Sequence, residues 1–199
     1  ASARRAPQRG GRGRGGRGVR GGAGGVGEGG GVARTAATGG AAAGDGTGVL
    51  MLASVAAMQG RIARWHALGE AVAPMRLGTV AANVFTNPEV ASVGVTQRQV
   101  EAGGVAAVTV TLPLATNARA KMQGLSDGFV KLFCRPGTGT VLGGVVVSPS
   151  ASELILSLSL AVQHSLTVDQ VAHTFAIYPS LSGSLTEAAR QLMLHDTTS

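Results

Sequence analysis

The chain has 199 residues, a formal net charge of +7 and a hydrophobic content of 44%, which allows one or two folded domains. A single cysteine, Cys134, excludes an internal disulfide, a CxxC motif and a redox-active cysteine pair, and suits a reducing compartment. No apolar run reaches the ~20 residues of a membrane-spanning helix, and the basic start lacks the apolar segment of a secretory signal, so we expect a soluble, cytoplasmic protein.

The positive charge belongs to the first 43 residues, which hold eight arginines against the single acid Glu28, whereas residues 44–199 are neutral overall. Half of the 32 glycines also precede residue 44. Such a composition buries too little apolar surface to offset the entropy of ordering, so we expect residues 1–31 to be disordered. Arg/Gly-rich segments can bind RNA, but this one has no aromatic residue. RNA binding stays an alternative, and we expect no nucleic-acid partner.

After the tail, small residues lead into the turn Gly44-Asp45-Gly46 and then into a helical pattern. Apolar side chains recur there at steps of three and four between residues 52 and 63, and Gly69 is a plausible stop. An acidic turn beside a helix N-terminus suits a nucleotide or flavin, because the first N–H groups are unpaired and lie at positive potential.

Residues 79–199 alternate between strand and helix patterns. In the first half, we predict two strands in 79–95 broken at Asn87-Pro88, a helix at 96–102 capped by Thr96, and a strand at 106–114. A polar segment at 115–124 and a hairpin at 128–148 follow. The last three elements are helices at 150–166, capped near Ser150 or Ser152, at 167–175, capped by Thr167, and at 182–194. These elements predict an α+β domain, an antiparallel sheet with helices on one face. Cys134 falls inside a strand, as a small buried thiol would.

The sequence offers few candidate catalytic residues of its own. Its four histidines form no HxH or HxxxH pair, so no metal site is expected. His66 and His164 fall late in helices, where a surface histidine interacts favourably with the negative end of the helix dipole. Neither therefore needs a catalytic role. His173 precedes the Tyr178-Pro179 step by five residues and remains a candidate. No GxGxxG motif follows a strand, and no serine lies in a nucleophile elbow.

Four stretches occur in the order found in one family: "AAAGDGTG", "MLASVAAMQG", "VFTNPEVASVGVT" and "YPSLSGSLTEA". Together they resemble the C-terminal half of the flavoprotein disulfide reductases, the pyridine nucleotide-disulfide oxidoreductase family that includes dihydrolipoamide dehydrogenase. The resemblance implies three parts: the tail at 1–31, a remnant of the FAD-binding domain with one flavin-contact helix at 32–78, and an interface domain at 79–199.

The resemblance also implies site residues. Gly44 and Asp45 would contact a hydroxyl near the ribityl chain or pyrophosphate of FAD. The backbone at Leu52 and Ala53 would face the pyrimidine edge of the flavin, where the helix dipole stabilises negative charge. The turn carrying Tyr178 and Pro179 would reach the partner subunit's flavin in a homodimer.

Two departures from the family pattern change the expected chemistry. Where disulfide-reducing members have a His and, five residues later, a Glu, this chain has Tyr178 and Gly183, and a phenol is a poor base at neutral pH. The segments "TNARAKM" and "YPSLSGS" are instead similar to those of NAD(P)H:quinone reductases in the same family, so Tyr178 becomes a candidate contact for a quinone. The tail matches neither the first flavin motif nor the NAD-binding domain. We therefore expect the C-terminal part of an FAD-dependent NAD(P)H oxidoreductase, incomplete for catalysis, or alternatively an inactive dimerisation module.

Overall fold

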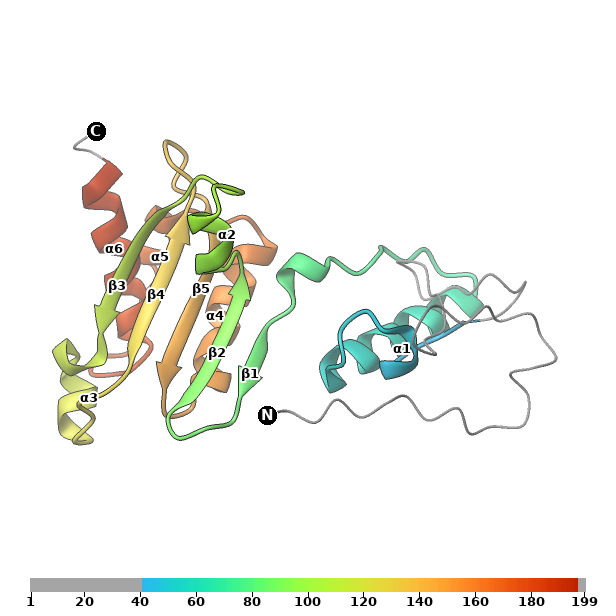
Figure 1. Ribbon diagram of the computed structural model, residues 1–199, viewed down its shortest axis with the longest axis horizontal. Coiled ribbons are helices and arrows are strands. Elements are labelled where there is room, and N and C mark those ends of the chain that lie inside the picture. The colour runs from blue at the N-terminus through green and yellow to red at the C-terminus, as the bar shows by residue number, and fades with distance from the viewer. Residues whose placement is uncertain (1–40, 197–199) are drawn as a thin grey trace. The chain divides into compact units, whose positions relative to one another are not determined.

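The computed structural model describes residues 41–196, with side chains up to residue 193 (Figure 1). The chain divides into two compact units, the first ending at Arg76 and the second beginning at Leu77. The predicted tail at 1–31, and the RNA-binding alternative that depends on it, lie outside the described residues. No helix within residues 41–196 is long and apolar enough to cross a membrane.

The described part of the first unit, residues 41–76, contains a turn and a helix. The 3₁₀ turn Asp45–Thr47 is followed by α1, Ala53–Ala67. The buried residues of α1 are Val55, Gln59 and Ile62, whose spacing places them on one face, as the pattern predicted. The helix ends before Gly69, whose φ of 82° is the left-handed conformation that commonly terminates a helix.

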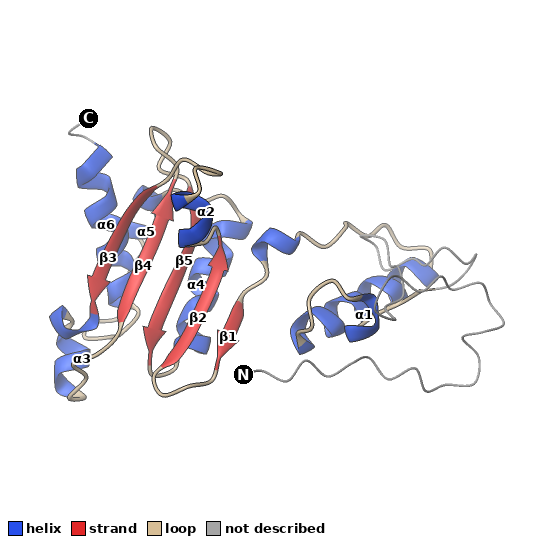
Figure 2. Cartoon of the chain, viewed as in Figure 1, coloured by secondary structure: helices blue, strands red, loops and turns tan. Residues whose placement is uncertain are grey.

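The second unit is built on a five-stranded antiparallel sheet, drawn in red in Figure 2. Its strands are β1 Ala82–Val84, β2 Glu89–Gly94, β3 Val108–Pro113, β4 Phe129–Cys134 and β5 Val141–Ser148. They lie in the order β1-β2-β5-β4-β3. Each predicted strand is present, including the pair broken at Asn87-Pro88 and the β4–β5 hairpin.

Helices complete the second unit: α2 Gln97–Glu101, α3 Ala118–Met122, α4 Ala151–Gln163, α5 Val168–Ala172 and α6 Gly183–Asp196. α4 packs against β2 and β5, and α6 against β3 and β4, on the same face of the sheet (Figure 1). This arrangement confirms the predicted α+β fold. The short helix α2 lies over the opposite face, where Lys131 Nζ donates a hydrogen bond to Gln97 Oε1 at 3.5 Å.

One continuous apolar core lies between the sheet and the helices. Alternate residues of β4, Val130, Leu132 and the predicted buried thiol Cys134, point into it and are almost fully buried. At Gly144 a Cβ atom would lie 2.7 Å from the Leu158 side chain. Glycine therefore lets α4 approach β5 closely, which fixes the position of the helices behind the sheet.

The helix starts in this unit show how the sequence fixes its boundaries. Thr96 and Thr167 cap α2 and α5, as predicted, and the structure shows that each forms a complete capping box. Ser150 occupies the N-cap position of α4, but its side chain makes no capping bond. The Glu89 carboxylate replaces it by accepting a hydrogen bond from the Ser152 backbone N–H at 2.9 Å. The Glu of the "TNPE" motif thus ties β2 to the start of α4.

Candidate functional site

The Gly44-Asp45 turn lies against the first turns of α1. A Cβ atom placed on Gly44 would lie 3.7 Å from the Ala56 side chain, and the φ of Gly44 is 83°, which disfavours other residues. Asp45 is exposed, and within residues 41–193 its carboxylate has no hydrogen-bond or ion-pair partner. The turn therefore presents an uncommitted carboxylate beside a helix start.

A buried glutamine, not identified from the sequence, holds this turn in place. Gln59 Oε1 accepts a hydrogen bond from Gly44 N at 2.7 Å, and Gln59 Nε2 donates to Thr47 Oγ1 at 3.2 Å. The Thr47 hydroxyl in turn donates to Gly44 O at 2.8 Å. Gln59 is only 6% exposed, and its place on the apolar face of α1, where a polar residue needs a partner, was the available signal.

The start of α1 suits a negatively polarised ligand group. Leu52 occupies the N-cap position and contributes no side-chain cap to the amides that begin at Ala53. Unpaired N–H groups at a helix N-terminus, together with the helix dipole, favour negative charge. The structure thus brings together Gly44, Asp45, Leu52 and Ala53 in one unit.

Tyr178 and Pro179 belong to the second unit, in the segment between α5 and α6. Tyr178 is 85% exposed, and its hydroxyl makes no hydrogen bond within residues 41–193. Phe175 and Ile177, in the same segment, are also exposed. A run of exposed large apolar residues between two helices is unusual for a monomer and indicates a contact surface.

A pocket of about 600 Å³ opens beside Tyr178. One wall is formed by residues 116–118, before and at the start of α3, and the other by residues 172–178 and the first turns of α6. Glu187 and His173 line this pocket together with Tyr178.

Asn117, the N-cap of α3, connects the two walls. Its Nδ2 donates to Ser180 O at 2.9 Å and to Ser184 Oγ at 2.8 Å. The sequence predicted only a polar segment here, because a five-residue helix leaves little periodicity. The Asn-x-x pattern before an Ala-rich turn was the signal for its cap.

At the two positions where the resemblance implies an acid–base pair, this chain has Tyr178 and Gly183. Gly183 begins α6, and a Cβ atom there would meet only Ser180 Oγ at 3.7 Å, an ordinary contact. Glu187, one turn later, is paired with Arg190 through Oε1–Nη2 at 2.6 Å and Oε2–Nε at 2.9 Å. The Arg190 hydrogen bond lowers the pKa of Glu187, and the same pair raises the pKa of Arg190. Glu187 is therefore a carboxylate held in a surface ion pair with Arg190.

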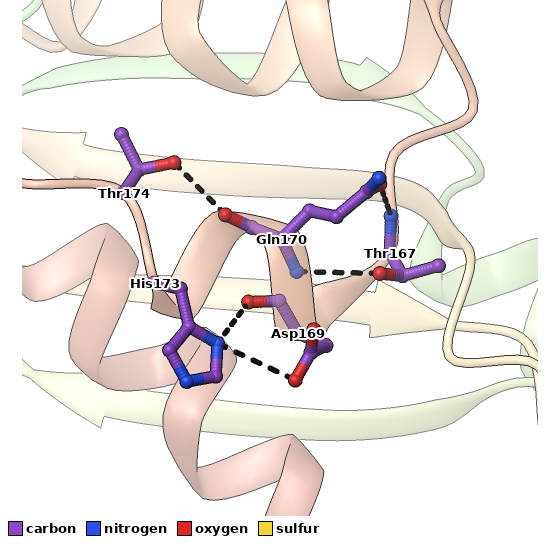
Figure 3. A network of polar contacts seen from close by, with 5 residues as sticks. All are labelled: Thr167, Asp169, Gln170, His173 and Thr174. Atoms are coloured by element: carbon purple, nitrogen blue, oxygen red, sulfur yellow. Dashed lines mark hydrogen bonds and ion pairs between the residues drawn. The ribbon is translucent and has the colours of Figure 1, made fainter.

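His173, the C-cap residue of α5, interacts with Asp169 of that helix (Figure 3). Its Nδ1 lies 2.9 Å from Asp169 O and 3.4 Å from Asp169 Oδ1. A carbonyl oxygen can only accept, so Nδ1 carries the proton in this bond. This is the arrangement of an exposed histidine near a helix C-terminus, although its ring also borders the Tyr178 pocket. Among residues 41–196, no cluster of three His, Cys, Asp or Glu side chains could hold a metal ion.

Comparison with known families identifies this architecture as that of an oxidoreductase dimerisation domain. The model of the pyridine nucleotide-disulphide oxidoreductase dimerisation domain matches residues 80–189. The chain belongs to this family, as the four sequence stretches predicted.

Within the family, two kinds of relative are similar. An NAD(P)H dehydrogenase (quinone) from Mycobacterium tuberculosis is 67% identical over 165 residues, which cover 83% of this chain and 34% of the relative. A dihydrolipoyl dehydrogenase from Haloferax volcanii is 38% identical over 143 residues, covering 72% of this chain and 30% of the relative. The chain thus spans about a third of the length of the curated relatives that it matches.

Solved structures agree with this assignment. The crystal structure of LpdA from Mycobacterium tuberculosis superimposes with a TM-score of 0.86 at 63% identity, covering 88% of this chain and 38% of that chain. RclA, an HOCl-induced flavoprotein disulfide reductase from Escherichia coli, gives a TM-score of 0.80 at 26% identity, covering 87% of this chain and 40% of that chain.

Proposed function

We propose that this chain is the C-terminal part of an FAD-dependent NAD(P)H oxidoreductase whose acceptor is a quinone rather than a disulfide. The observation that carries the proposal is the turn at Tyr178, which keeps the family's frame without its acid–base pair. Dithiol chemistry needs a base that takes up and returns a proton at sulfur. Neither exposed Tyr178 nor Gly183 supplies one, and Glu187 is already paired with Arg190.

The similarity to relatives favours the same acceptor. The relative with 67% identity is described as an NAD(P)H dehydrogenase (quinone), whereas the dihydrolipoyl dehydrogenases from Haloferax volcanii and Bacillus subtilis are each 38% identical. Reduction of a quinone to a hydroquinone by NAD(P)H takes up one hydride equivalent and one proton, and the proton can come from water at an exposed site. The loss of a thiol acid–base pair is therefore compatible with quinone reduction.

Part of the FAD site fits the residues present. The uncommitted carboxylate of exposed Asp45 could accept a hydrogen bond from a cofactor hydroxyl, and the uncapped amides after Leu52 suit the pyrimidine edge of a flavin. When bound, the cofactor supplies hydride transfer from NAD(P)H to a two-electron acceptor. In this proposal residues 32–78 belong to the FAD-binding domain and residues 79–199 to the interface domain.

A homodimer completes the proposal. The matching family model is that of a dimerisation domain, and the second unit exposes apolar side chains on α4 and in the segment before α6. These are Leu156, Leu160, Phe175 and Ile177. Pairing with a second copy would remove them from water and carry Tyr178 to the partner, so the site would depend on the two-fold axis.

An inactive dimerisation module is the second candidate. It is favoured by the match of residues 80–189 to a dimerisation domain and by the Tyr and Gly that stand at positions 178 and 183 in place of an acid–base pair. In that case the second unit keeps its association surface while no turnover occurs.

Acceptor assays separate the two candidates. The full chain is incubated with FAD, unbound FAD is removed, and the bound flavin is reduced chemically with exclusion of oxygen. Its reoxidation is then followed with a soluble quinone or with lipoamide. The proposal predicts reoxidation by the quinone and none by lipoamide. A chain that binds flavin but reduces neither acceptor is a dimerisation module. Preferential reduction of lipoamide would contradict the interpretation of the Tyr178 turn.

A further inference from the structure

The Asn117 side chain makes four hydrogen bonds to two segments far apart in sequence. Its Oδ1 accepts from Arg119 N at 2.8 Å and from Ala120 N at 3.2 Å, which caps α3. Its Nδ2 donates to Ser180 O at 2.9 Å and to Ser184 Oγ at 2.8 Å. Every good donor and acceptor position of the amide is therefore in use.

Only an amide of this length fits both halves of the arrangement. An aspartate could still cap α3, but it has no proton to donate and would bring a negative charge against the Ser180 carbonyl oxygen. A serine could also cap α3, but its hydroxyl is too short to bridge to the second segment. The donors to Ser180 and Ser184 thus give Asn117 a role beyond that of an ordinary helix cap.

The second segment is the turn that presents Tyr178. Ser180, whose carbonyl oxygen Asn117 holds, also accepts a hydrogen bond at Oγ from Gly183 N at 3.1 Å and so ties the turn to the start of α6. Tyr178 lies two residues before Ser180 and makes no hydrogen bond of its own within residues 41–193. Its direction is consequently set by the backbone of the turn.

We propose that Asn117 is the positioning residue of the Tyr178 turn and fixes the width of the pocket between α3 and α6. The pocket lies between the two segments that Asn117 joins. This inference deepens the proposed function, because a ring-shaped acceptor beside Tyr178 would meet a side chain aimed by Asn117. The hydrogen bonds themselves depend on neither flavin nor acceptor.

The chain offers a specific probe, since Tyr178 is its only tyrosine. Full-length chain labelled with fluorotyrosine will show one fluorine NMR resonance, that of Tyr178. We expect a single narrow line for the wild type. For Asn117→Asp and Asn117→Ser we expect a displaced line, or one broadened about twofold or more by exchange between turn conformations, while circular dichroism shows an unchanged fold.

Thr96→Val is the matched control. It removes another N-cap in the same unit, that of α2, without touching the turn, so its melting temperature falls while the Tyr178 resonance stays in place. A purely capping role for Asn117 would give the same pattern in Asn117→Asp and Asn117→Ser, and that result would overturn the proposal.

Ser184→Ala covers the case in which the Asn117 variants do not fold. It deletes one acceptor of the amide and leaves the α3 cap and the Ser180 contact intact. A displaced resonance in this variant supports the proposal, and an unchanged one overturns it. Because the readout needs no cofactor, absence of quinone reduction would count against the proposed function alone.

Discussion

The two units hold their candidate functional turns by the same kind of hydrogen bond, but they differ in the size of the apolar core behind those turns. In each, one amide side chain from a separate element binds the backbone of the functional turn: Gln59 holds Gly44, and Asn117 holds Ser180. The second unit also has a continuous core between its sheet and helices, whereas the described part of the first buries only Val55 and Ile62 as apolar residues.

This difference indicates where stability and chemistry reside. Burial of apolar surface is the main stabilising contribution to folding, so the second unit carries its own stability. In the described residues 41–76 of the first unit, α1 is the one long helix, and an isolated helix of this length is marginal in water. The contact residues for the cofactor are thus predicted to be the less stable part of the molecule.

The largest effect is expected from Leu132→Ala in the centre of β4. Leu132 is 0% exposed, and its truncation should lower the free energy of unfolding of the second unit by about 2–5 kcal/mol. Urea unfolding followed by far-ultraviolet circular dichroism measures this change. Trp65, the only tryptophan and part of α1, reports the first unit separately.

The matched variant is Ile62→Ala, on the buried face of α1. It should move the Trp65 fluorescence transition and leave the main circular dichroism transition in place. If the fluorescence and circular dichroism transitions coincided and shifted together in both Leu132→Ala and Ile62→Ala, the two units would unfold as one cooperative structure. The proposed difference in their stability would then be wrong.

A smaller effect is expected from Gln59→Ala. This change leaves the part-buried N–H of Gly44 without its partner, at a cost of about 1–3 kcal/mol. The Trp65 transition should move to lower urea, and any flavin affinity should fall with it. Gln97→Ala, on the exposed surface of α2, is the control and should change neither. If Gln59→Ala and Gln97→Ala gave the same Trp65 transition and the same flavin affinity, Gln59 would not be the residue that holds the Gly44 turn.

The exposed apolar side chains of the second unit, among them Phe175 and Ile177, are proposed to form the dimer interface. Phe175→Ser together with Ile177→Ser removes two exposed apolar side chains. Because burial of each contributes about 1.5–3 kcal/mol at most, dimer affinity should fall by roughly tenfold or more. Sedimentation velocity across a concentration series measures it. Folding of the monomer should be unaffected, and an unchanged dissociation constant would place the interface elsewhere.

The smallest effect concerns Glu89 at the start of α4. The hydrogen bond from the Ser152 backbone N–H, followed by that from the Ser152 hydroxyl, lowers the pKa of Glu89 below 4.5. A lowered pKa means that the carboxylate stabilises the fold above pH 4.5, and that this contribution is lost as pH falls through the folded-state value. Glu89→Gln should therefore be less stable at neutral pH, and its melting temperature should fall less steeply than that of the wild type as the pH is lowered.

Ser152→Ala provides the graded comparison for Glu89. It removes only the hydroxyl and keeps the backbone N–H, which has the larger effect on the pKa of Glu89. The fall in its melting temperature at low pH should therefore be intermediate between those of the wild type and Glu89→Gln. A melting temperature that falls as steeply in Glu89→Gln as in the wild type would mean that other groups govern the pH dependence.

Much of the second unit was predictable because its local signals agree. The alternation of β3 and β4, the threonine caps of α2 and α5, and the "TNPE" motif each point to the observed element. The cap of α4 was not predictable in detail, since Glu89 reaches it from 63 residues away. Gln59 and Asn117 were missed for a related reason. The local pattern marks a polar residue on an apolar face and a helix cap, but the partners that each holds are 15 and 63 residues away, and only the fold brings them together.

We propose above all that the turn at Asp45 and the start of α1 belong to a flavin site in a dimer. The most direct test is the visible absorbance of the full chain after incubation with FAD and passage through a sizing column. We predict flavin absorbance that elutes with a dimer and is lost in Gln59→Ala. A colourless dimer would contradict the claim and leave subunit association as the function of this chain.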